Sequence, residues 1–424
     1  MQDLIATPYV PGQARGVLSR NPNEPGAIVV LDSPTLPPAA QPAAVIVIDG
    51  APFSHPMLAL LARGLPTVIT TAADAANLND GELVQLDGAR GLVWSVQPFE
   101  PFAPAEPPLP AAGEPLYTAD GEPVLLRASV RDAAGAARAK ERGAESIGLV
   151  RTEFIEPPDG RQPDAAFYRE AFGALLTAAH PLAVTLRLLD IAADKRPAWL
   201  PQGHDGGPLG RQGVRLFDTD PVRGVVAAQL AALARLNAPE RLRLLLPYIT
   251  TAAEAKRWHT EIRAQLDVPI GVMIETPAAA LDIAALLDAA DFAALGTNDL
   301  MQCLFAADRD QPALRGYLDA YAPLLYRFLK EVARAAGPRL PELQVCGLLQ
   351  QLPGVLPVLL GLGYRAFSVD AVFIPYLAAA VQRTRIDAAR ALAEDVCRAQ
   401  GSGEVRGRLR ALVHALGRGV GHCG

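Results

Sequence analysis

The sequence predicts an α/β protein in which a (β/α)8 barrel follows a small α/β domain. Three observations support this fold class: strand-like apolar runs alternate with amphipathic segments over about 300 residues, shorter apolar runs crowd the first 96 residues, and a proline-rich stretch separates the two regions. Eight strands that alternate with helices are typical of a closed parallel barrel. A doubly wound open sheet is the competing arrangement of the same elements.

Residues 1–96 hold short apolar runs bounded by turn residues, which predicts the strands of a small α/β domain. The runs lie at 27–31, 43–49, 66–70, 82–87 and 91–96.

One helix is expected after His55. Ser54 is placed to cap it, Pro56 suits a first helical position, and the apolar side chains at 57–61 need burial. A helix N-terminus stabilises an anion, so His55 has two interpretations: a phosphoryl carrier, or an ordinary loop histidine.

Residues 97–120 mark the boundary between the two regions. Seven of these 24 residues are proline, a density that favours a stiff, extended connector with little core of its own. The expected domains are therefore 1–96 and 121–424, joined by this linker.

The second region supplies the eight predicted barrel strands. They lie at 124–130, 146–154, 183–191, 243–249, 270–276, 293–299, 344–349 and 366–372. The clearest helical segments between them lie at 133–144, 164–179, 252–266 and 314–336.

Composition excludes several classes of protein. The 424-residue chain has a formal net charge of −6, which argues against a nucleic-acid or polybasic membrane surface. No signal peptide and no membrane-spanning run of about 18 residues is expected. The four cysteines are far apart, which favours reduced thiols and a cytoplasmic location.

Polar residues recur where the predicted barrel strands end, which is where barrel active sites lie. Five basic residues are expected to converge there: Arg127, Arg151, Arg187, Arg215 and Lys195. The carboxylates Glu275 and Asp299 and the thiol of Cys346 belong to the same set. Arginine binds phosphate and carboxylate oxygens, and two carboxylates with open positions suit Mg²⁺, so a polyanion with Mg²⁺ is one interpretation. A set of structural arginine–carboxylate pairs is the other.

Two segments carry a more specific signal. GVMIETPAA (271–279) and LGTNDLMQCLFAADR (295–309) resemble the barrel signatures of the phosphoenolpyruvate-utilising enzymes, and within that family the chain is most similar to Enzyme I of the sugar phosphotransferase system. GAESIGLVRTEF, VTLRLLDIAADK, GVRL, VCG and FSVDAVFIP match further blocks in the same order. The resemblance covers about residues 120–395. The first domain resembles the family's swivelling phosphohistidine domain, with His55 at the phosphohistidine position.

The resemblance implies a role for each matching residue. Glu275 and Asp299 match the Mg²⁺ ligands, and Cys346 matches the residue that protonates the enolate carbon. Groups that hold or support phosphoenolpyruvate are matched by Arg151, Arg187, Arg215, Asn298, Lys195 and Arg309. A thiol suits proton donation because surrounding charge can tune its pKa toward neutrality.

The implied reaction is phosphoryl transfer from phosphoenolpyruvate to His55, which yields pyruvate, with onward transfer to a phosphocarrier protein. The linker would then swing His55 into and out of the barrel mouth. Family barrels commonly dimerise, so a homodimer is expected.

Several positions depart from the family pattern. Phe53 and Leu61 replace polar residues near the phosphohistidine, Leu348 replaces a glutamate, alanines replace paired glycines before Lys195, and the helical carrier-docking insert is missing. Arg63 is a possible substitute for the arginine lost at Leu61. These departures leave a second hypothesis open: a sensor or regulatory subunit that binds phosphoenolpyruvate or pyruvate without transferring phosphate.

Overall fold

The protein consists of two compact units. A computed structural model describes residues 3–98, 101–191, 196–201, 209–236 and 239–417. The first unit comprises Met1–Pro108, Arg309–Leu318 and Pro375–Ala379. The second comprises Leu109–Asp308, Asp319–Ile374 and Ala380–Gly424.

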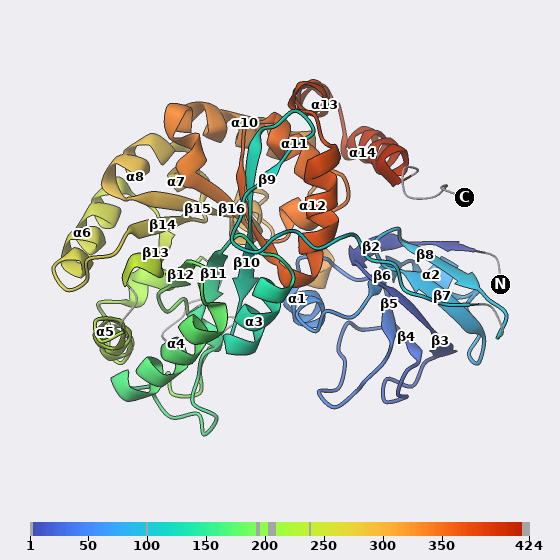
Figure 1. The fold of residues 1–424 in the computed structure, drawn as a ribbon, viewed down its shortest axis with the longest axis horizontal. Coiled ribbons are helices and arrows are strands. Elements are labelled where there is room, and N and C mark those ends of the chain that lie inside the picture. Colours follow the sequence, from blue (N-terminus) through green and yellow to red (C-terminus); the bar gives the residue numbers. More distant parts are fainter. Residues whose placement is uncertain (1–2, 99–100, 192–195, 202–208, 237–238, 418–424) are drawn as a thin grey trace. The chain divides into compact units, whose positions relative to one another are not determined.

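An eight-stranded sheet in the order β1-β8-β7-β3-β4-β5-β6-β2 forms the first unit (Figure 1). Strands β3 to β6 are parallel, and β7, β8, β1 and β2 join antiparallel at the two sides. All five predicted strands are confirmed. The elements are β1 (Leu4–Ile5), β2 (Thr7–Val10), β3 (Gln13–Ser19), β4 (Ile28–Leu31), β5 (Ala44–Ile48), α1 (His55–Leu61), β6 (Thr67–Thr70), α2 (Ala72–Ala75), β7 (Leu83–Asp87) and β8 (Leu92–Ser95).

Helix α1 begins at His55, as the sequence predicts, but its cap is different. Ser54 occupies the N-cap position, yet its hydroxyl donates to the carbonyl of Ala51 at 2.9 Å and caps no helical N–H. The expected side-chain cap at Ser54 is therefore wrong. Met57, Leu60 and Leu61 are buried, which confirms that the helix has an apolar face.

Eight parallel strands form a closed barrel in the second unit. Strand β10 pairs with both β11 and β17, which closes the cylinder and overturns the open-sheet alternative. The strands are β10 (Pro123–Val130), β11 (Ile147–Arg151), β12 (Val184–Arg187), β13 (Leu242–Ile249), β14 (Ile270–Ile274), β15 (Phe292–Gly296), β16 (Leu343–Cys346) and β17 (Ala366–Asp370). Leu149, Leu245, Met273 and Ala294 from four of these strands pack in one buried cluster.

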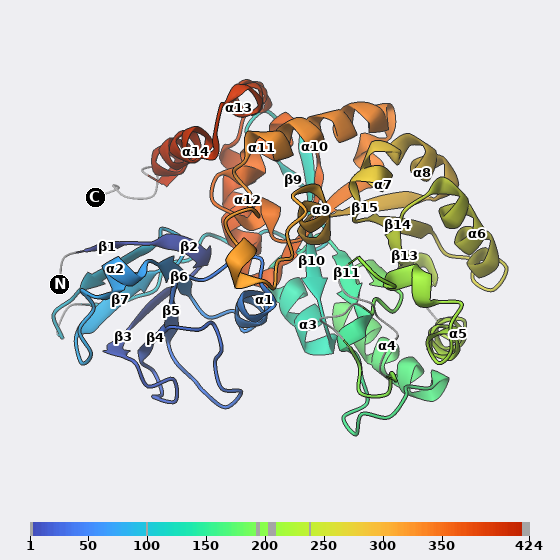
Figure 2. The ribbon, with the colours of Figure 1, turned by 180° about the vertical axis from the view of Figure 1, so that it is seen from behind.

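Helices surround this barrel in both views (Figures 1 and 2). They are α3 (Ala133–Glu141), α4 (Ala165–Ala179), α5 (Val222–Leu233), α6 (Ala252–Arg263), α7 (Pro277–Leu281), α8 (Ile283–Ala289), α9 (Thr297–Leu304), α10 (Pro323–Ala336), α11 (Val355–Gly361) and α12 (Ile374–Arg383). Two further helices follow: α13 (Ile386–Arg398), which packs on α10 and α11, and α14 (Ser402–Gly417). Side chains fix several starts: Asp132, Asp164, Thr251 and Thr276 each accept a backbone N–H of the first turn. In the part of the chain described above, no helix has the length and apolarity needed to cross a bilayer.

Six of the eight predicted barrel strands run too far at their carboxyl ends, whereas the ends predicted for β10 and β13 are confirmed. Residues predicted as strand after Arg151 form a 3-10 turn (Thr152–Phe154), and those after Gly296 begin α9. The reason is that a buried apolar run has no periodicity that separates a strand from the turn that follows it. The helix predicted over 314–336 begins only at Pro323, which occupies the first turn.

The proline-rich stretch contributes to the barrel sheet at its end. The contact boundary between the units falls between Pro108 and Leu109. Strand β9 (Leu116–Tyr117) then pairs antiparallel with β10, and Leu116 is buried. The last part of the predicted connector is therefore packed structure, which its proline content did not indicate.

Candidate active site

The carboxyl ends of the barrel strands bring most of the predicted polar residues to one rim. Arg151 ends β11 and lies opposite Arg187, which ends β12, and Cys346 ends β16. Glu275 follows β14 directly, and Asn298 and Asp299 form the first turn of α9 after β15. In a parallel barrel these ends share one face, so residues far apart in the sequence lie around one centre.

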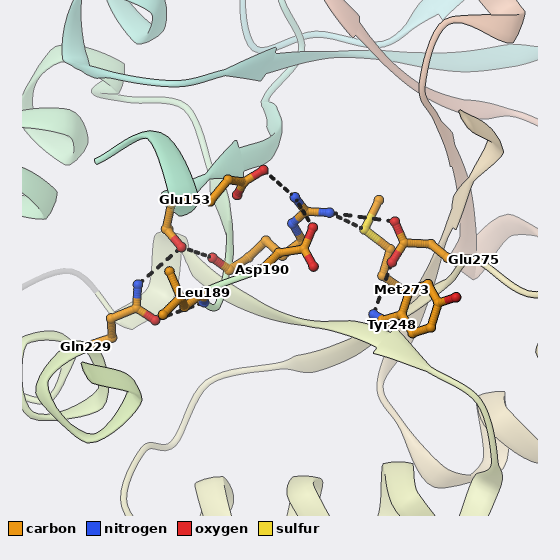
Figure 3. A network of polar contacts seen from close by, with 9 residues as sticks. Glu153, Leu189, Asp190, Gln229, Tyr248, Met273 and Glu275 are labelled. Carbon is orange, nitrogen blue, oxygen red and sulfur yellow. Dashed lines mark hydrogen bonds and ion pairs between the residues drawn. The ribbon is translucent and has the colours of Figure 1, made fainter. Parts of the chain in front are cut away.

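Arg187 lies at the centre of a buried acidic cluster (Figure 3). Its side chain is 4 % exposed, and its Nη2 atom lies 2.6 Å from Glu153 Oε1 and 2.7 Å from Asp190 Oδ2. Its Nη1 atom lies 3.7 Å from Glu275 Oε1 and 3.2 Å from the sulfur of Met273. Burial alone would lower the pKa of Arg187, but Asp190, Glu153 and Glu275 together raise it well above its usual value. The guanidinium is therefore permanently charged and held by acids.

A buried amide holds the backbone beneath this cluster (Figure 3). Gln229 of α5 is fully buried; its Oε1 accepts the N–H of Leu189 at 3.0 Å and its Nε2 donates to Thr152 Oγ1 at 3.1 Å. The Thr152 hydroxyl donates in turn to the carbonyl of Arg187 at 2.8 Å. These bonds satisfy buried polar groups and fix the end of β12, which sets where the Arg187 side chain emerges.

Glu275 is fixed from two sides. Its Oε2 accepts the backbone N–H of Tyr248 at 3.0 Å, and Tyr248 adopts a left-handed φ of 53° to present that N–H. Gly296 makes room for the carboxylate, because a Cβ there would lie 2.7 Å from Glu275 Cγ. The position of this carboxylate is thus determined by backbone as well as by Arg187.

Cys346 and Asn298 are tied to each other through neighbouring backbone. Thr297 Oγ1 donates to the carbonyl of Cys346 at 2.8 Å, and Asn298 Oδ1 accepts the N–H of Leu348 at 2.9 Å. Gly347 between them has a φ of 110°, and a Cβ on it would lie 2.4 Å from Thr297 Oγ1.

The Cys346 thiol differs from the sequence-based expectation. It is fully buried, and burial raises its pKa to about 12, although the charges of Arg151 and Arg187 act in the opposite direction. The expected tuning toward neutrality is therefore wrong, because desolvation outweighs the nearby cations. The sulfur stays protonated at neutral pH.

Arg151 and Arg131, also at this rim, differ from Arg187 in how they are paired. Within the residues that the structure describes, neither Arg151 nor Arg131 forms a hydrogen bond or an ion pair. Arg131 follows β10, its guanidinium lies 4.3 Å from the centre of the Phe154 ring, and burial together with the charge of Arg151 lowers its pKa. Two adjacent cations of this kind favour binding of an anion.

The remaining predicted cations do not all converge. Arg215 is exposed, donates to Thr250 Oγ1 at 3.0 Å and lies 4.9 Å from the ring centre of Tyr248. Arg127 instead contacts Glu145 and Gln344 near the amino ends of the strands, so its predicted place at the rim is wrong. The strand-end argument failed there because β10 continues for three residues after Arg127. Lys195 lies outside the described residues.

His55 and Arg309 belong to the first unit. The backbone N–H of His55 donates to Asp310 Oδ1 at 2.8 Å, and Arg309 is 7 % exposed with its Nε 4.0 Å from Asp310 Oδ2. Phe53 is buried next to the helix start. Arg63 donates hydrogen bonds to the carbonyls of Pro37 and Ala40. Its guanidinium is therefore bound to these backbone groups and does not replace the arginine lost at Leu61.

Sequence reasoning missed Glu153, Asp190, Gln229 and Arg131. Glu153 and Asp190 follow an arginine that ends a strand by two and three residues. A buried arginine needs acidic partners, and acids that directly follow the same strand ends are the first places to look. In the described part of the chain, no group of three or more histidine, cysteine, aspartate or glutamate side chains is arranged to hold a metal ion.

Comparison with known proteins agrees with this architecture. The chain is 32% identical over 378 residues to a phosphoenolpyruvate-protein phosphotransferase of Streptomyces coelicolor, covering 86% of this chain and 67% of the relative. A phosphoenolpyruvate-protein phosphotransferase of Haloferax volcanii is 30% identical, with 90% of this chain and 71% of the relative covered. A multiphosphoryl transfer protein of Xanthomonas campestris is 31% identical, but this chain spans only 45% of it.

The family assignment has its own support. The sequence model described as PEP-utilising enzyme, PEP-binding domain, matches residues 111–386, which include the whole barrel. The motifs at 271–279 and 295–309 lie within this match, at the rim that holds Glu275 and Asp299. The chain therefore belongs to the family of phosphoenolpyruvate-utilising enzymes.

Proposed function

We propose that this chain is a phosphotransferase that moves the phosphoryl group of phosphoenolpyruvate to His55 and releases pyruvate. The observation that carries the proposal is the barrel rim, where Arg151 and Arg131, unpaired among the described residues, lie near a buried set of carboxylates around Arg187. Phosphoenolpyruvate carries a phosphate and a carboxylate, so it needs both cations and a site for a counter-ion. The names of the relatives support the same reaction.

The carboxylates fit Mg²⁺. Glu275 and Asp299 offer hard oxygen donors on one rim, and the Tyr248 N–H together with the missing side chain at Gly296 fixes the position of Glu275. Two carboxylates suffice for Mg²⁺, which keeps several waters and takes further ligands from substrate phosphate. When bound, the ion would neutralise charge on the phosphate and the enolate oxygen.

The protein groups have distinct tasks in this reaction. Arg151, Arg131 and Arg215 hold the two anionic groups of the substrate, and the amide nitrogen of Asn298 donates to it while Asn298 Oδ1 remains bound to Leu348. Arg187 forms ion pairs with three carboxylates, so we assign it the role of holding Glu275 in place. Lys195 and Arg309 are proposed as supporting cations by their place in the motifs.

The chemical step breaks the bond between phosphorus and the enol oxygen and forms a bond between phosphorus and an imidazole nitrogen of His55. The electron pair left on the enolate takes a proton at carbon from the Cys346 thiol, which gives pyruvate. A thiol with a pKa of about 12 is fully protonated at neutral pH and is therefore ready to donate. Solvent then reprotonates the thiolate.

The phosphorylated His55 would pass its group to a phosphocarrier protein, with the part of the predicted linker 97–120 that precedes Leu109 as the arm on which the first unit moves. We also propose a homodimer. Light scattering tests this state, since a monomer has a mass of 44.8 kDa.

The test uses Mg²⁺ and phosphoenolpyruvate labelled in the phosphate. We expect an acid-labile, alkali-stable label on the chain and one pyruvate released per label. His55→Ala should abolish the label, whereas His180→Ala, at an exposed histidine of the second unit, should keep it. If nothing is labelled while phosphoenolpyruvate still raises the melting temperature, the proposal is wrong and the chain is a sensor. The buried Phe53 and Leu61 beside His55 make that outcome worth testing.

A further inference from the structure

A second group of arginines lies inside the barrel at the opposite end. Arg243 is the second residue of β13, Phe292 the first of β15 and Gln344 the second of β16, whereas Arg187 and Cys346 are the last residues of their strands. Glu145 precedes β11 by two residues and contacts Arg127 of β10. Since all eight strands are parallel, these residues share the amino end of the barrel, away from the rim described above.

Arg243 is a cation without an acidic partner. Its guanidinium lies 3.8 Å from the centre of the Phe292 ring, and in the described residues it forms no ion pair or hydrogen bond. Burial, together with the charge of Arg127, lowers its pKa to about 10, and Glu145 and Asp291 offset the change only in part. A guanidinium that stacks on a ring keeps its N–H groups free at the edge of the plane.

The neighbouring acids, Glu145 and Asp291, already accept hydrogen bonds from other groups. Glu145 Oε2 accepts from Arg127 Nε at 3.2 Å and from the Ser146 hydroxyl at 2.8 Å. Asp291 Oδ2 accepts the N–H of Ile270 at 2.7 Å and lies 3.3 Å from His259 Nε2.

Arg127 is held in place by uncharged groups as well. Its Nη1 donates to Gln344 Oε1 at 3.1 Å, and Gln344 is oriented by its own bond to the carbonyl of Gly148 at 2.8 Å. One carboxylate, Glu145, therefore lies directly against Arg127, and its charge also acts on Arg243.

We propose that the amino end of the barrel binds a small oxyanion, a phosphate or carboxylate group of a small molecule, between Arg127 and Arg243. Both partners are positioned before the ligand arrives, by Gln344 and by Phe292. The side chains of Arg127 and Glu145 are 14% and 22% exposed, so solvent reaches the site. The site is independent of the phosphotransfer proposed above, because it uses none of the same residues.

Isothermal titration with inorganic phosphate, and separately with malonate, at constant ionic strength tests this site. Arg243→Gln should lower the affinity for the more tightly bound of the two anions at least tenfold, because a charge-assisted pair of hydrogen bonds is lost. Arg243→Lys, which keeps the charge but not the planar fork, should weaken it less. The control Arg235→Gln, at an exposed arginine just past α5, should change it less than twofold.

Glu145→Gln separates a binding site from a merely structural cluster. Removing the competing carboxylate should tighten the anion several-fold, whereas a structural cluster would show weaker binding or none. Preference for phosphate or for malonate identifies the ligand group, and selenate soaked into crystals should give an anomalous peak between Arg127 and Arg243. The proposal is overturned if neither anion binds, if Arg243→Gln binds like the wild type, or if Glu145→Gln weakens binding.

Discussion

Replacing Arg187 by methionine should destabilise the barrel far more than the loss of an arginine at the surface. Methionine keeps much of the side-chain volume but removes the guanidinium that contacts the carboxylates of Glu153, Asp190 and Glu275, each at most 7% exposed. Removing one partner of a buried ion pair typically costs about 3–5 kcal/mol. For about 300 residues, an unfolding entropy of about 2.1 cal/mol/K per residue amounts to about 0.6 kcal/mol/K, so the melting temperature should fall by about 5–8 °C.

Arg257→Met is the matched control. Arg257 also binds acids with good geometry, with both Nη atoms 2.7 Å from Asp218 and Nε 2.9 Å from Glu261, but its side chain is 49% exposed. Exposed pairs of this kind contribute about 0–1 kcal/mol, so the shift should stay below about 2 °C.

Differential scanning calorimetry of the barrel transition measures both variants. The loss of stability in Arg187→Met should grow as pH rises from 5 to 8. A buried acid that loses a neighbouring cation has its folded-state pKa raised, so its ionisation above the unfolded-state pKa opposes folding. Equal shifts for Arg187→Met and Arg257→Met, at every pH, would refute the view that burial makes this cluster strong.

Three further outcomes are expected. Gly347→Ala should lower the melting temperature by several degrees in calorimetry, because its Cβ would lie 2.4 Å from Thr297 Oγ1 at a φ of 110°; an unchanged value would contradict the close packing of this turn. Cys346 should resist iodoacetamide at pH 8 in the native protein and react after unfolding, as mass spectrometry can read, because only a thiolate reacts and its pKa is about 12. Glu275→Gln should reduce pyruvate release at least a hundredfold, whereas Glu261→Gln, at an exposed glutamate of α6, should leave it unchanged.

The barrel could be predicted closely because its strands are buried on both faces. The run predicted at 270–276 corresponds to β14 (Ile270–Ile274), and the run at 366–372 to β17 (Ala366–Asp370). Continuous apolar runs between turn residues mark such strands whatever the tertiary context. The carboxyl ends of six of the eight strands were predicted too late, because a buried apolar run does not distinguish a strand from the buried turn that follows it.

The candidate site was less predictable, because the pKa values and contacts of its side chains depend on how deeply each is buried and on which residues surround it. The sequence placed Arg127 and Arg187 in the same class, yet Arg187 ends its strand, whereas β10 continues for three residues beyond Arg127. Cys346 was expected among cations that would lower its pKa, but complete burial dominates. Gln229, an outer-helix residue that supports the rim, has no motif and becomes visible only when its three-dimensional partners are known.

The backbone conformation of Tyr248 lowers the stability of the barrel but fixes the position of Glu275. A left-handed backbone at a bulky residue costs on the order of 1–3 kcal/mol, and what it secures is one N–H aimed at Glu275. Glycine or asparagine would tolerate this conformation and keep the same backbone N–H for Glu275. The strain therefore belongs to the tyrosine side chain, which also lies against the guanidinium of Arg215.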